Sequence, residues 1–232
     1  MDLVRYGKVS EALFEIQEIC SIYKIRYCIV GSLALIGGLN QFVRIPHDVD
    51  IVYDINQRFK LNETLLKKGY KMTVLDDPLN IFVPPFEHYE KDGKIIEAAP
   101  VAFTQKGMEF VFPLPIPLPK HWRPCINLII SKTMSKPQVY KINDISFFGF
   151  SKEAQWVHLK MFVGKLGPLD KKRKQREKDL ILLSDCLDWG IVSQIISEQP
   201  GLYYKNIPLV TPKRHELLSL GRLLFKAERI FS

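Results

Sequence analysis

Hydrophobic residues between positions 9 and 23 recur at intervals of three and four residues, which is the spacing of one face of an α-helix. The next segment, residues 25–30, is a short apolar run with β-branched members, and it predicts a buried strand. Gly31 and Ser32 interrupt this run before the apolar residues 33–36. The pattern therefore predicts an amphipathic helix, a strand, a tight turn and a second, short helix in succession.

A second strand is indicated where polar and apolar residues alternate after residue 47. Because successive side chains of a strand point to opposite faces, Asp48 and Asp50 are expected on one face. Val49, Ile51 and Tyr53 are expected on the other face, toward the core. Two carboxylates are therefore placed side by side near the turn at Gly31-Ser32.

Helices and strands are harder to assign in the middle of the chain. Residues 55–68 have the pattern of a helix, and residues 70–75 that of a strand. The segment from residue 76 to residue 124 is rich in proline, and the pair Asp92-Gly93 within it is typical of a hairpin turn.

The pattern becomes helical after Phe150. Ser151 is a candidate N-cap for a first helix that stops at Gly167-Pro168. Further helices are expected over residues 171–187, 191–198 and 213–230. We therefore expect an α+β protein with a mixed β-sheet core over residues 1–150 and a helical C-terminal domain over residues 151–232.

The turn and the two aspartates are the chain's clearest chemical feature. A helix that begins at Ser32 directs its free N–H groups and the positive end of its dipole at the space beside Gly31, where a glycine lets a phosphate come close. Asp48 and Asp50 offer hard oxygen ligands, which suit Mg²⁺ or Mn²⁺. Taken together, these residues indicate a nucleotide and metal site.

At these residues the chain resembles the nucleotidyltransferase superfamily, which has the DNA polymerase beta-like fold. The superfamily signature is Gly-Ser followed, after a spacer, by Asp-x-Asp. Here Gly31-Ser32 is followed by fifteen residues and then Asp48-Val49-Asp50. Arg44, Lys160, the basic stretch from Lys171 to Arg176 and the pair Lys178-Asp179 narrow the resemblance to the AbiEii-like, abortive-infection group, which resembles type IV toxins. The resemblance implies that Gly31, Ser32, Arg44 and Lys160 bind the nucleotide.

The chain departs from the superfamily pattern at one position. Members usually carry a third carboxylate, which binds a metal and acts as the base, on a later strand of the form apolar, Asp, apolar, apolar. The segment that we match to this strand, residues 125–130, has Asn127 at that position. An amide cannot accept a proton at neutral pH. Glu97 or Glu109 is a weaker match that would restore a carboxylate.

The resemblance implies transfer of a nucleoside monophosphate from an NTP to a hydroxyl, with release of pyrophosphate. The acceptor stays open between a tRNA or other RNA end, a protein and a small molecule, as in antibiotic nucleotidyltransferases. Resemblance to toxin-like members also implies an antitoxin protein as a partner. The alternative is a regulatory protein of the same fold that binds nucleotide or RNA and has lost catalysis with the base at Asn127.

Composition and charge add a partner class. The chain has 232 residues, 47% of them hydrophobic, and a net charge of +8. Eight Lys or Arg residues against two acids lie between Lys160 and Lys178, so this basic stretch, residues 160–178, is a candidate contact for tRNA or another nucleic acid. A solvated helix face is the other interpretation of that stretch. Lys160 differs because it lies within an apolar run, where a cation needs an anionic partner.

Four scattered cysteines point to a reducing compartment, and the apolar segments are too short to span a membrane. The cysteines form no Cys-x-x-Cys pair, which favours buried thiols over disulfides or a zinc site. No stretch of eighteen consecutive apolar residues occurs, so no membrane-spanning segment is expected. We therefore expect a cytoplasmic protein.

Overall fold

The computed structural model describes residues 3–75, 86–113, 125–142, 144–160, 173–204 and 207–210. The helices are α1 (Leu3–Ile22), α2 (Gly31–Leu39), α3 (Arg58–Lys67), α4 (Lys152–His158), α5 (Arg173–Ser184) and α6 (Trp189–Ser197), with a 3₁₀ turn, η1 (Ile55–Gln57). The strands are β1 (Tyr27–Ile29), β2 (Val49–Asp54), β3 (Lys71–Leu75), β4 (Phe86–Lys91), β5 (Lys94–Thr104), β6 (Gly107–Pro113), β7 (Cys125–Ser131), β8 (Pro137–Ile142), β9 (Ile145–Phe150), β10 (Gly201–Tyr204) and β11 (Ile207–Val210).

The described strands form one mixed sheet in the order β11-β10-β7-β6-β5-β2-β1-β9-β8. β2 pairs parallel with β5 and antiparallel with β1, and β1 pairs parallel with β9. The long strand β5 links two parts of the sheet, because its first residues pair with β2 and β4 while its last residues pair with β6. Strands β3 and β4 extend the sheet as a branch beside β5.

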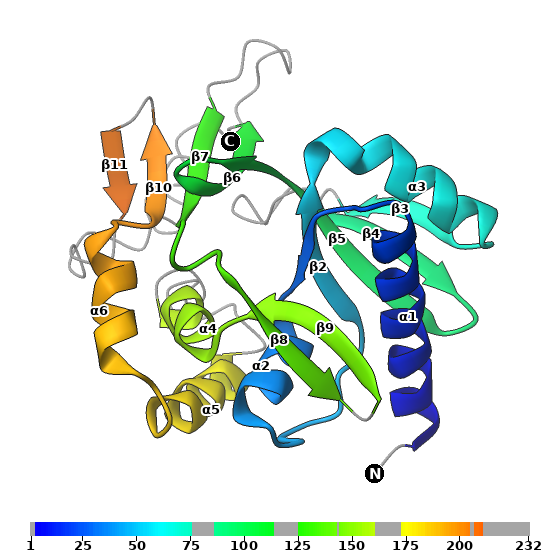
Figure 1. The fold of residues 1–232 in the computed structure, drawn as a ribbon, viewed down its shortest axis with the longest axis horizontal. Helices are drawn as coiled ribbons and strands as arrows, with labels where there is room; N and C mark the ends of the chain where they lie inside the picture. Colours follow the sequence, from blue (N-terminus) through cyan, green and yellow to red (C-terminus); the bar gives the residue numbers. More distant parts are fainter. Residues whose placement is uncertain are drawn as a thin grey trace, which may run out of the picture.

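Helices α1 and α3 cover one side of the sheet (Figure 1). The predicted apolar face of α1 is buried, and Ala12, Leu13 and Ile16 are at most 1% exposed. Val49, Ile51 and Tyr53 of β2 are also fully buried, as the alternation of polar and apolar residues predicted. One face of β2 therefore belongs to the core, which leaves the other face to carry Asp50.

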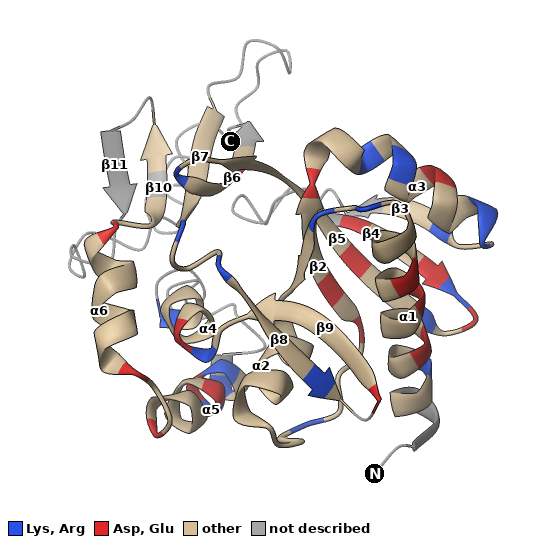
Figure 2. Ribbon diagram, in the orientation of Figure 1, with Lys and Arg blue, Asp and Glu red and all other residues tan. Residues whose placement is uncertain are grey.

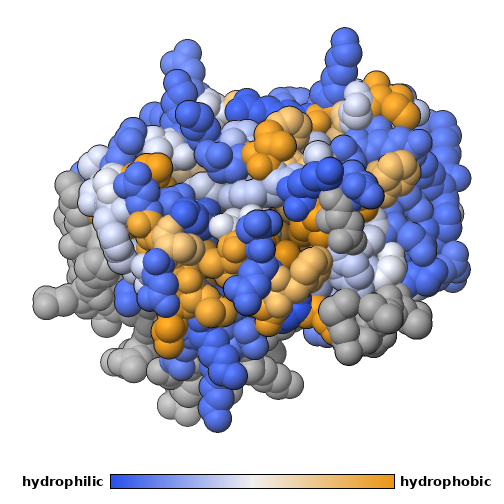
Figure 3. Space-filling view, turned by 60° about the horizontal axis from the view of Figure 1, so that its bottom comes forward, coloured by the Kyte–Doolittle hydropathy of each residue, from blue (hydrophilic) through white to orange (hydrophobic). Residues whose placement is uncertain are grey.

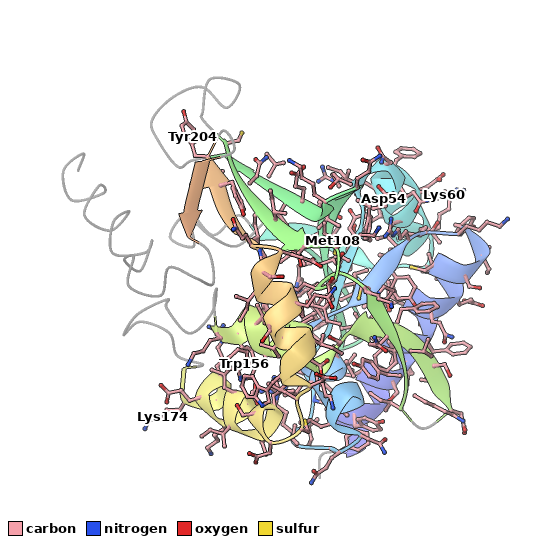
Figure 4. All side chains as sticks on the ribbon, turned by 60° about the vertical axis from the view of Figure 1, so that its left-hand side comes forward. Asp54, Lys60, Met108, Trp156, Lys174 and Tyr204 are labelled. Carbon is pink, nitrogen blue, oxygen red and sulfur yellow. The ribbon has the colours of Figure 1, made fainter. Side chains whose placement is uncertain are left out.

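Helix α4 packs beside α2, and its Trp156, labelled in Figure 4, joins α4 to α5 and α6. The indole Nε1 of Trp156 donates a hydrogen bond of 3.0 Å to Oγ of Ser184 at the end of α5. Its ring packs edge to face on Trp189 of α6, with 5.3 Å between the ring centroids. Ser151 caps α4 as predicted, because its Oγ accepts a hydrogen bond from the N–H of Ala154. These contacts hold α5 and α6 against α4, which itself packs on α2.

The α+β class and the mixed sheet are confirmed, but the C-terminal part also contains strands that the sequence did not predict. β10 pairs antiparallel with β7, so residues 201–204 add a strand to the sheet. The predicted helix stop at Gly167-Pro168 and the predicted helix 213–230 lie outside the described residues. The division into domains at residue 150 stays a prediction.

Exposed hydrophobic residues are not confined to one element. Figure 3 shows hydrophobic side chains gathered between hydrophilic ones on the face that lies at the bottom of Figure 1.

Within the part of the chain that is described, no single helix is long and apolar enough to cross a membrane. The helical residues Lys174–Ser184 and Trp189–Ser197 meet the length and composition requirement together, but they are bent by 117°.

Candidate active site

Three carboxylates from neighbouring strands meet on the open face of the sheet. Asp48 lies directly before β2, Asp50 lies on β2, and Glu97 lies on β5 opposite Asp50 in the parallel register. One carboxylate oxygen from each of the three lies within 4.8 Å of the others, and all three side chains are partly exposed. Figure 2 shows the acidic positions on the adjacent strands β2 and β5. The cluster is therefore open to a ligand.

Gly31 lies against this cluster, where a larger residue would be strained and would displace Asp50. Its φ angle is +64°, a left-handed conformation that favours glycine. A Cβ atom added at this position would lie 2.0 Å from Oδ2 of Asp50. The N–H of Val30 donates a hydrogen bond of 2.9 Å to the backbone oxygen of Asp50, which fixes the turn beside the strand. The N-terminal end of α2 therefore lies next to the carboxylates, as the sequence predicted.

The donor set fits a divalent cation. Three carboxylate oxygens within 4.8 Å of one another form a hard ligand set, which suits Mg²⁺ or Mn²⁺ better than a soft metal. Like charges this close repel unless a cation lies between them. Asp48 and Asp50 are the residues that would hold it, with the Glu97 carboxylate beside them.

Arg44 contacts the turn and the C-terminal helices at once. Its Nη2 and Nε atoms lie 3.1 and 3.3 Å from Oγ of Ser32, and its Nη1 lies 2.5 Å from Oδ2 of Asp179 on α5. Asp179 is 2% exposed and also accepts a hydrogen bond of 3.0 Å from Gln175. The structure thus brings Arg44 to Ser32, and a buried carboxylate holds it there.

Asn127 does not take the third corner of the site. It lies on β7, where it pairs with Val111 of β6 and with Tyr203 of β10. Strands β5 and β6 lie between β7 and β2, so the predicted match of residues 125–130 to the third catalytic strand is wrong. Glu109 pairs with Ala102 near the far end of β5, away from β2. Glu97, one of the two weaker matches, is the third member of the carboxylate cluster.

Lys160 is exposed, and its Nζ lies 6.0 Å from the ring centroid of Trp156. Its exposure removes the argument that a cation inside an apolar run needs an anionic partner, and its role in nucleotide binding stays a prediction. Residues 161–172 of the basic stretch lie outside the described residues. On α5, Lys174 and Lys178 are exposed, and Figure 4 shows Lys174 at the outer end of that helix. Nucleic-acid contact by this stretch stays a prediction.

His88 lies beside the carboxylate cluster, a position that the sequence did not predict. It lies on β4 directly opposite Glu97 in the antiparallel register of β4 and β5. Its Nδ1 lies 3.7 Å from Oε1 of Glu97. The proline-rich sequence around it hid the strand, but the Asp92-Gly93 turn sets the register that brings His88 to Glu97.

A groove of about 500 Å³ lies at the other end of β1. Its lining is mostly apolar, with Tyr27, Phe103 and Met108 among the residues, and Arg26 at its edge stacks over the Phe103 ring. None of the three clustered carboxylates lines it. The carboxylate cluster is therefore the better candidate for chemistry.

Comparison with known proteins agrees with this geometry. Residues 12–114, which include Gly31, Asp48, Asp50 and Glu97, match the family model described as aminoglycoside-2''-adenylyltransferase. The lincosamide antibiotic adenylyltransferase LnuA with lincomycin bound is 18% identical, with a TM-score of 0.53, over 76% of this chain and 97% of that chain. The solution structure of the antibiotic-resistance factor ANT(2'')-Ia is 16% identical, with a TM-score of 0.55, over 84% and 90%. The chain has a nucleotidyltransferase fold.

ANT(2'')-Ia in complex with adenylyl-2''-tobramycin shares this fold too, at 15% identity and a TM-score of 0.53 over 79% of this chain and 93% of that chain. No curated protein matches the sequence. The AbiEii-like subgroup stays a prediction. Identities of this size carry the nucleotidyltransferase fold to this chain but not a substrate.

Proposed function

We propose that this protein is a metal-dependent nucleotidyltransferase that moves AMP from ATP to a hydroxyl group of a small molecule. The observation that carries the proposal is the cluster of Asp48, Asp50 and Glu97, whose oxygens lie within 4.8 Å of one another beside Gly31. This cluster combines a divalent-metal site, a phosphate site and a carboxylate base in one place.

The turn and α2 hold the phosphates in this proposal. The first N–H groups of α2 have no partner within the helix, and they point, with the positive end of the helix dipole, toward the space beside Gly31. The hydroxyl of Ser32 adds a polar contact at the same end. Arg44 lies on Ser32 and brings a positive charge to the phosphate side of the site.

Asp48 and Asp50 would hold Mg²⁺ or Mn²⁺. When bound, the cation supplies charge neutralisation at the phosphate oxygens and at the leaving pyrophosphate. Asp50 is kept in place by the backbone hydrogen bond from Val30 and by its contact with Gly31. The ligands are therefore set by the strand and the turn before any substrate arrives.

Glu97 serves as the base. The acceptor hydroxyl oxygen forms a bond to the α-phosphorus as the bond from that phosphorus to the oxygen bridging to the β-phosphate breaks. The hydroxyl proton passes to the Glu97 carboxylate, and pyrophosphate leaves. Glu97 lies on the side of Asp50 away from β1, because β5 and β1 flank β2. The hydroxyl therefore enters from the β5 side, opposite the phosphate-binding turn.

The small-molecule acceptor is inferred from the structural neighbours. LnuA was solved with lincomycin, and ANT(2'')-Ia with adenylyl-2''-tobramycin. A tRNA end or an antitoxin partner rests on the basic stretch and on the abortive-infection resemblance, and residues 161–172 of that stretch are outside the described part of the chain. A non-catalytic binding protein is the less favoured alternative, because it was motivated by Asn127 and Glu97 supplies the missing carboxylate.

The test is transfer of label from α-³²P-ATP in the presence of Mg²⁺. Tobramycin, lincomycin and total tRNA are offered in separate reactions, with the Asp48→Ala/Asp50→Ala double variant as the control. We expect label in a small-molecule product with the unaltered protein alone, and loss of that label when EDTA removes the cation. Label in tRNA would replace the acceptor class. ATP binding without transfer to any of these acceptors would favour the binding protein.

A further inference from the structure

His88 belongs to the same row of side chains as the carboxylates. The register of β2 and β5 sets Asp50 opposite Glu97, and the register of β5 and β4 sets Glu97 opposite His88. Residues directly opposite each other on paired strands share a face of the sheet. Asp50, Glu97 and His88 therefore form a row across three neighbouring strands, with Glu97 in the middle.

The imidazole has a hydrogen-bonding atom that the described structure leaves unused. Nδ1 of His88 is buried and has no hydrogen-bond partner among the described residues. Buried polar atoms in folded proteins nearly always have one, because leaving them unpaired costs free energy. Its nearest carboxylate oxygen is Oε1 of Glu97 at 3.7 Å, beyond hydrogen-bond distance. A shift of less than about 1 Å would form the bond, and catalytic hydrogen bonds often tighten only when substrates bind.

We propose that His88 is a positioning residue for Glu97. In the loaded site its Nδ1–H donates a hydrogen bond to one Glu97 oxygen and turns the other oxygen toward the acceptor hydroxyl. The inference rests on the proposed function, because it assigns a role in the step for which Glu97 is the base. A neutral imidazole with its proton on Nδ1 is sufficient, so no change of charge is needed.

The surroundings of His88 fit this role better than a purely structural one. The ring lies among partly exposed polar groups rather than in the core, and its other nitrogen, Nε2, lies 3.9 Å from Oε2 of Glu90. The Glu90 side chain is 61% exposed and can move away, whereas the Nδ1 side is enclosed against Glu97. The buried nitrogen therefore faces the base, and the other nitrogen faces an exposed surface carboxylate.

The test compares three variants, His88→Asn, His88→Gln and His88→Ala, in the ATP transfer assay with the acceptor that the unaltered protein uses. The amide nitrogen of Asn takes the place of Nδ1, whereas that of Gln takes the place of Nε2. We expect His88→Ala and His88→Gln to lower kcat by about 10- to 100-fold, the usual cost of losing an orienting partner. We expect His88→Asn to stay close to the unaltered protein and the KM for ATP to be unchanged in all three.

Glu90→Gln is the matched control on the same strand and should leave kcat unchanged. Equal loss in the Asn and Gln variants, an unchanged kcat in His88→Ala, or a rise in the KM for ATP that accounts for the loss would each overturn the inference. If His88→Ala does not fold, the Asn and Gln variants decide. Absence of transfer by the unaltered protein is a failure of the proposed function and removes the inference with it, whereas transfer that is insensitive to His88 refutes the inference alone.

Discussion

Asp50 and Glu97 lie directly opposite each other on the parallel strands β2 and β5, so one register places two carboxylates at one point of the sheet. Parallel neighbours require a long connection, and here the connection holds α3, β3 and β4. The two residues are 47 positions apart in the sequence, yet the register fixes their separation as firmly as that of neighbours along a strand. The site therefore depends on strand pairing rather than on a local motif.

The first prediction separates Glu97 from Asn127. Glu97→Gln keeps the size and removes the proton acceptor, so kcat should fall by about 100- to 10,000-fold. Asn127→Ala, three strands from β2, should leave kcat within about twofold, as for a substitution away from the chemistry. Steady-state transfer from ATP measures both. Glu109→Gln is the control for loss of a carboxylate on β6, and a larger effect there than at Glu97 would contradict the assignment.

The second prediction concerns the turn at Gly31. Gly31→Ala places a Cβ 2.0 Å from Oδ2 of Asp50, at a φ of +64°. Backbone strain alone costs about 1–2 kcal/mol, and displacement of Asp50 adds a loss of activity. Gly93→Ala is the matched control, because Gly93 has a φ of +77° and nothing within 4 Å of the added Cβ.

Thermal unfolding and transfer activity distinguish the two variants. Both should unfold at a lower temperature, and only Gly31→Ala should lose transfer. Comparable activity in the two variants would show that the contact with Asp50 does not matter.

The third prediction concerns the buried pair of Arg44 and Asp179. Removing one partner leaves the other without its counter-charge, and this costs up to about 3–5 kcal/mol for a buried pair. We expect Arg44→Met to destabilise more than Asp179→Leu, because the Asp179 side chain is 2% exposed and the Arg44 side chain is 26% exposed. The double variant should be more stable than the sum of the single effects.

Urea unfolding measures these differences. The KM for ATP should rise in both single variants, because Arg44 is also held against Ser32. Additive losses in the double variant would mean that the two residues act independently.

How far the sequence predicts this site depends on which residues are local. The sequence predicts Gly31, Ser32, Asp48 and Asp50 because a strand, a turn and a second strand lie close together in the chain. Glu97 is harder to predict because the later apolar strand around Asn127 is a closer match to the superfamily pattern, although Ile-Glu-Ala-Ala at residues 96–99 has the same form with Glu in place of Asp.

Pairings over long distances are where sequence reasoning failed. The Asp92-Gly93 turn was recognised, and counting outward from it pairs His88 with Glu97, but the strand before the turn was hidden by the preceding prolines. The pairing of β10 with β7 joins residues more than 70 positions apart, and no local pattern encodes it. Hydrophobic periodicity gives elements, whereas register has to be worked out from turns or seen in the structure.

The last prediction is a loss of stability in mild acid caused by His158, at the end of α4. Burial, together with the nearby positive charge of Arg176, lowers the pKa of His158 to about 4 from an ordinary value of 6.5. Between these two values the unfolded chain binds a proton that the folded chain does not, so the free energy of unfolding falls as the pH decreases from 6.5 toward 4. Above 6.5 His158 makes no such contribution.

In His158→Gln the glutamine does not titrate, so the free energies of unfolding measured with urea at pH 7 and pH 5 should differ less than in the unaltered protein. His47→Gln, at an exposed position, is the control and should retain the full difference. An equal difference in His158→Gln and the unaltered protein would assign the acid sensitivity to other groups.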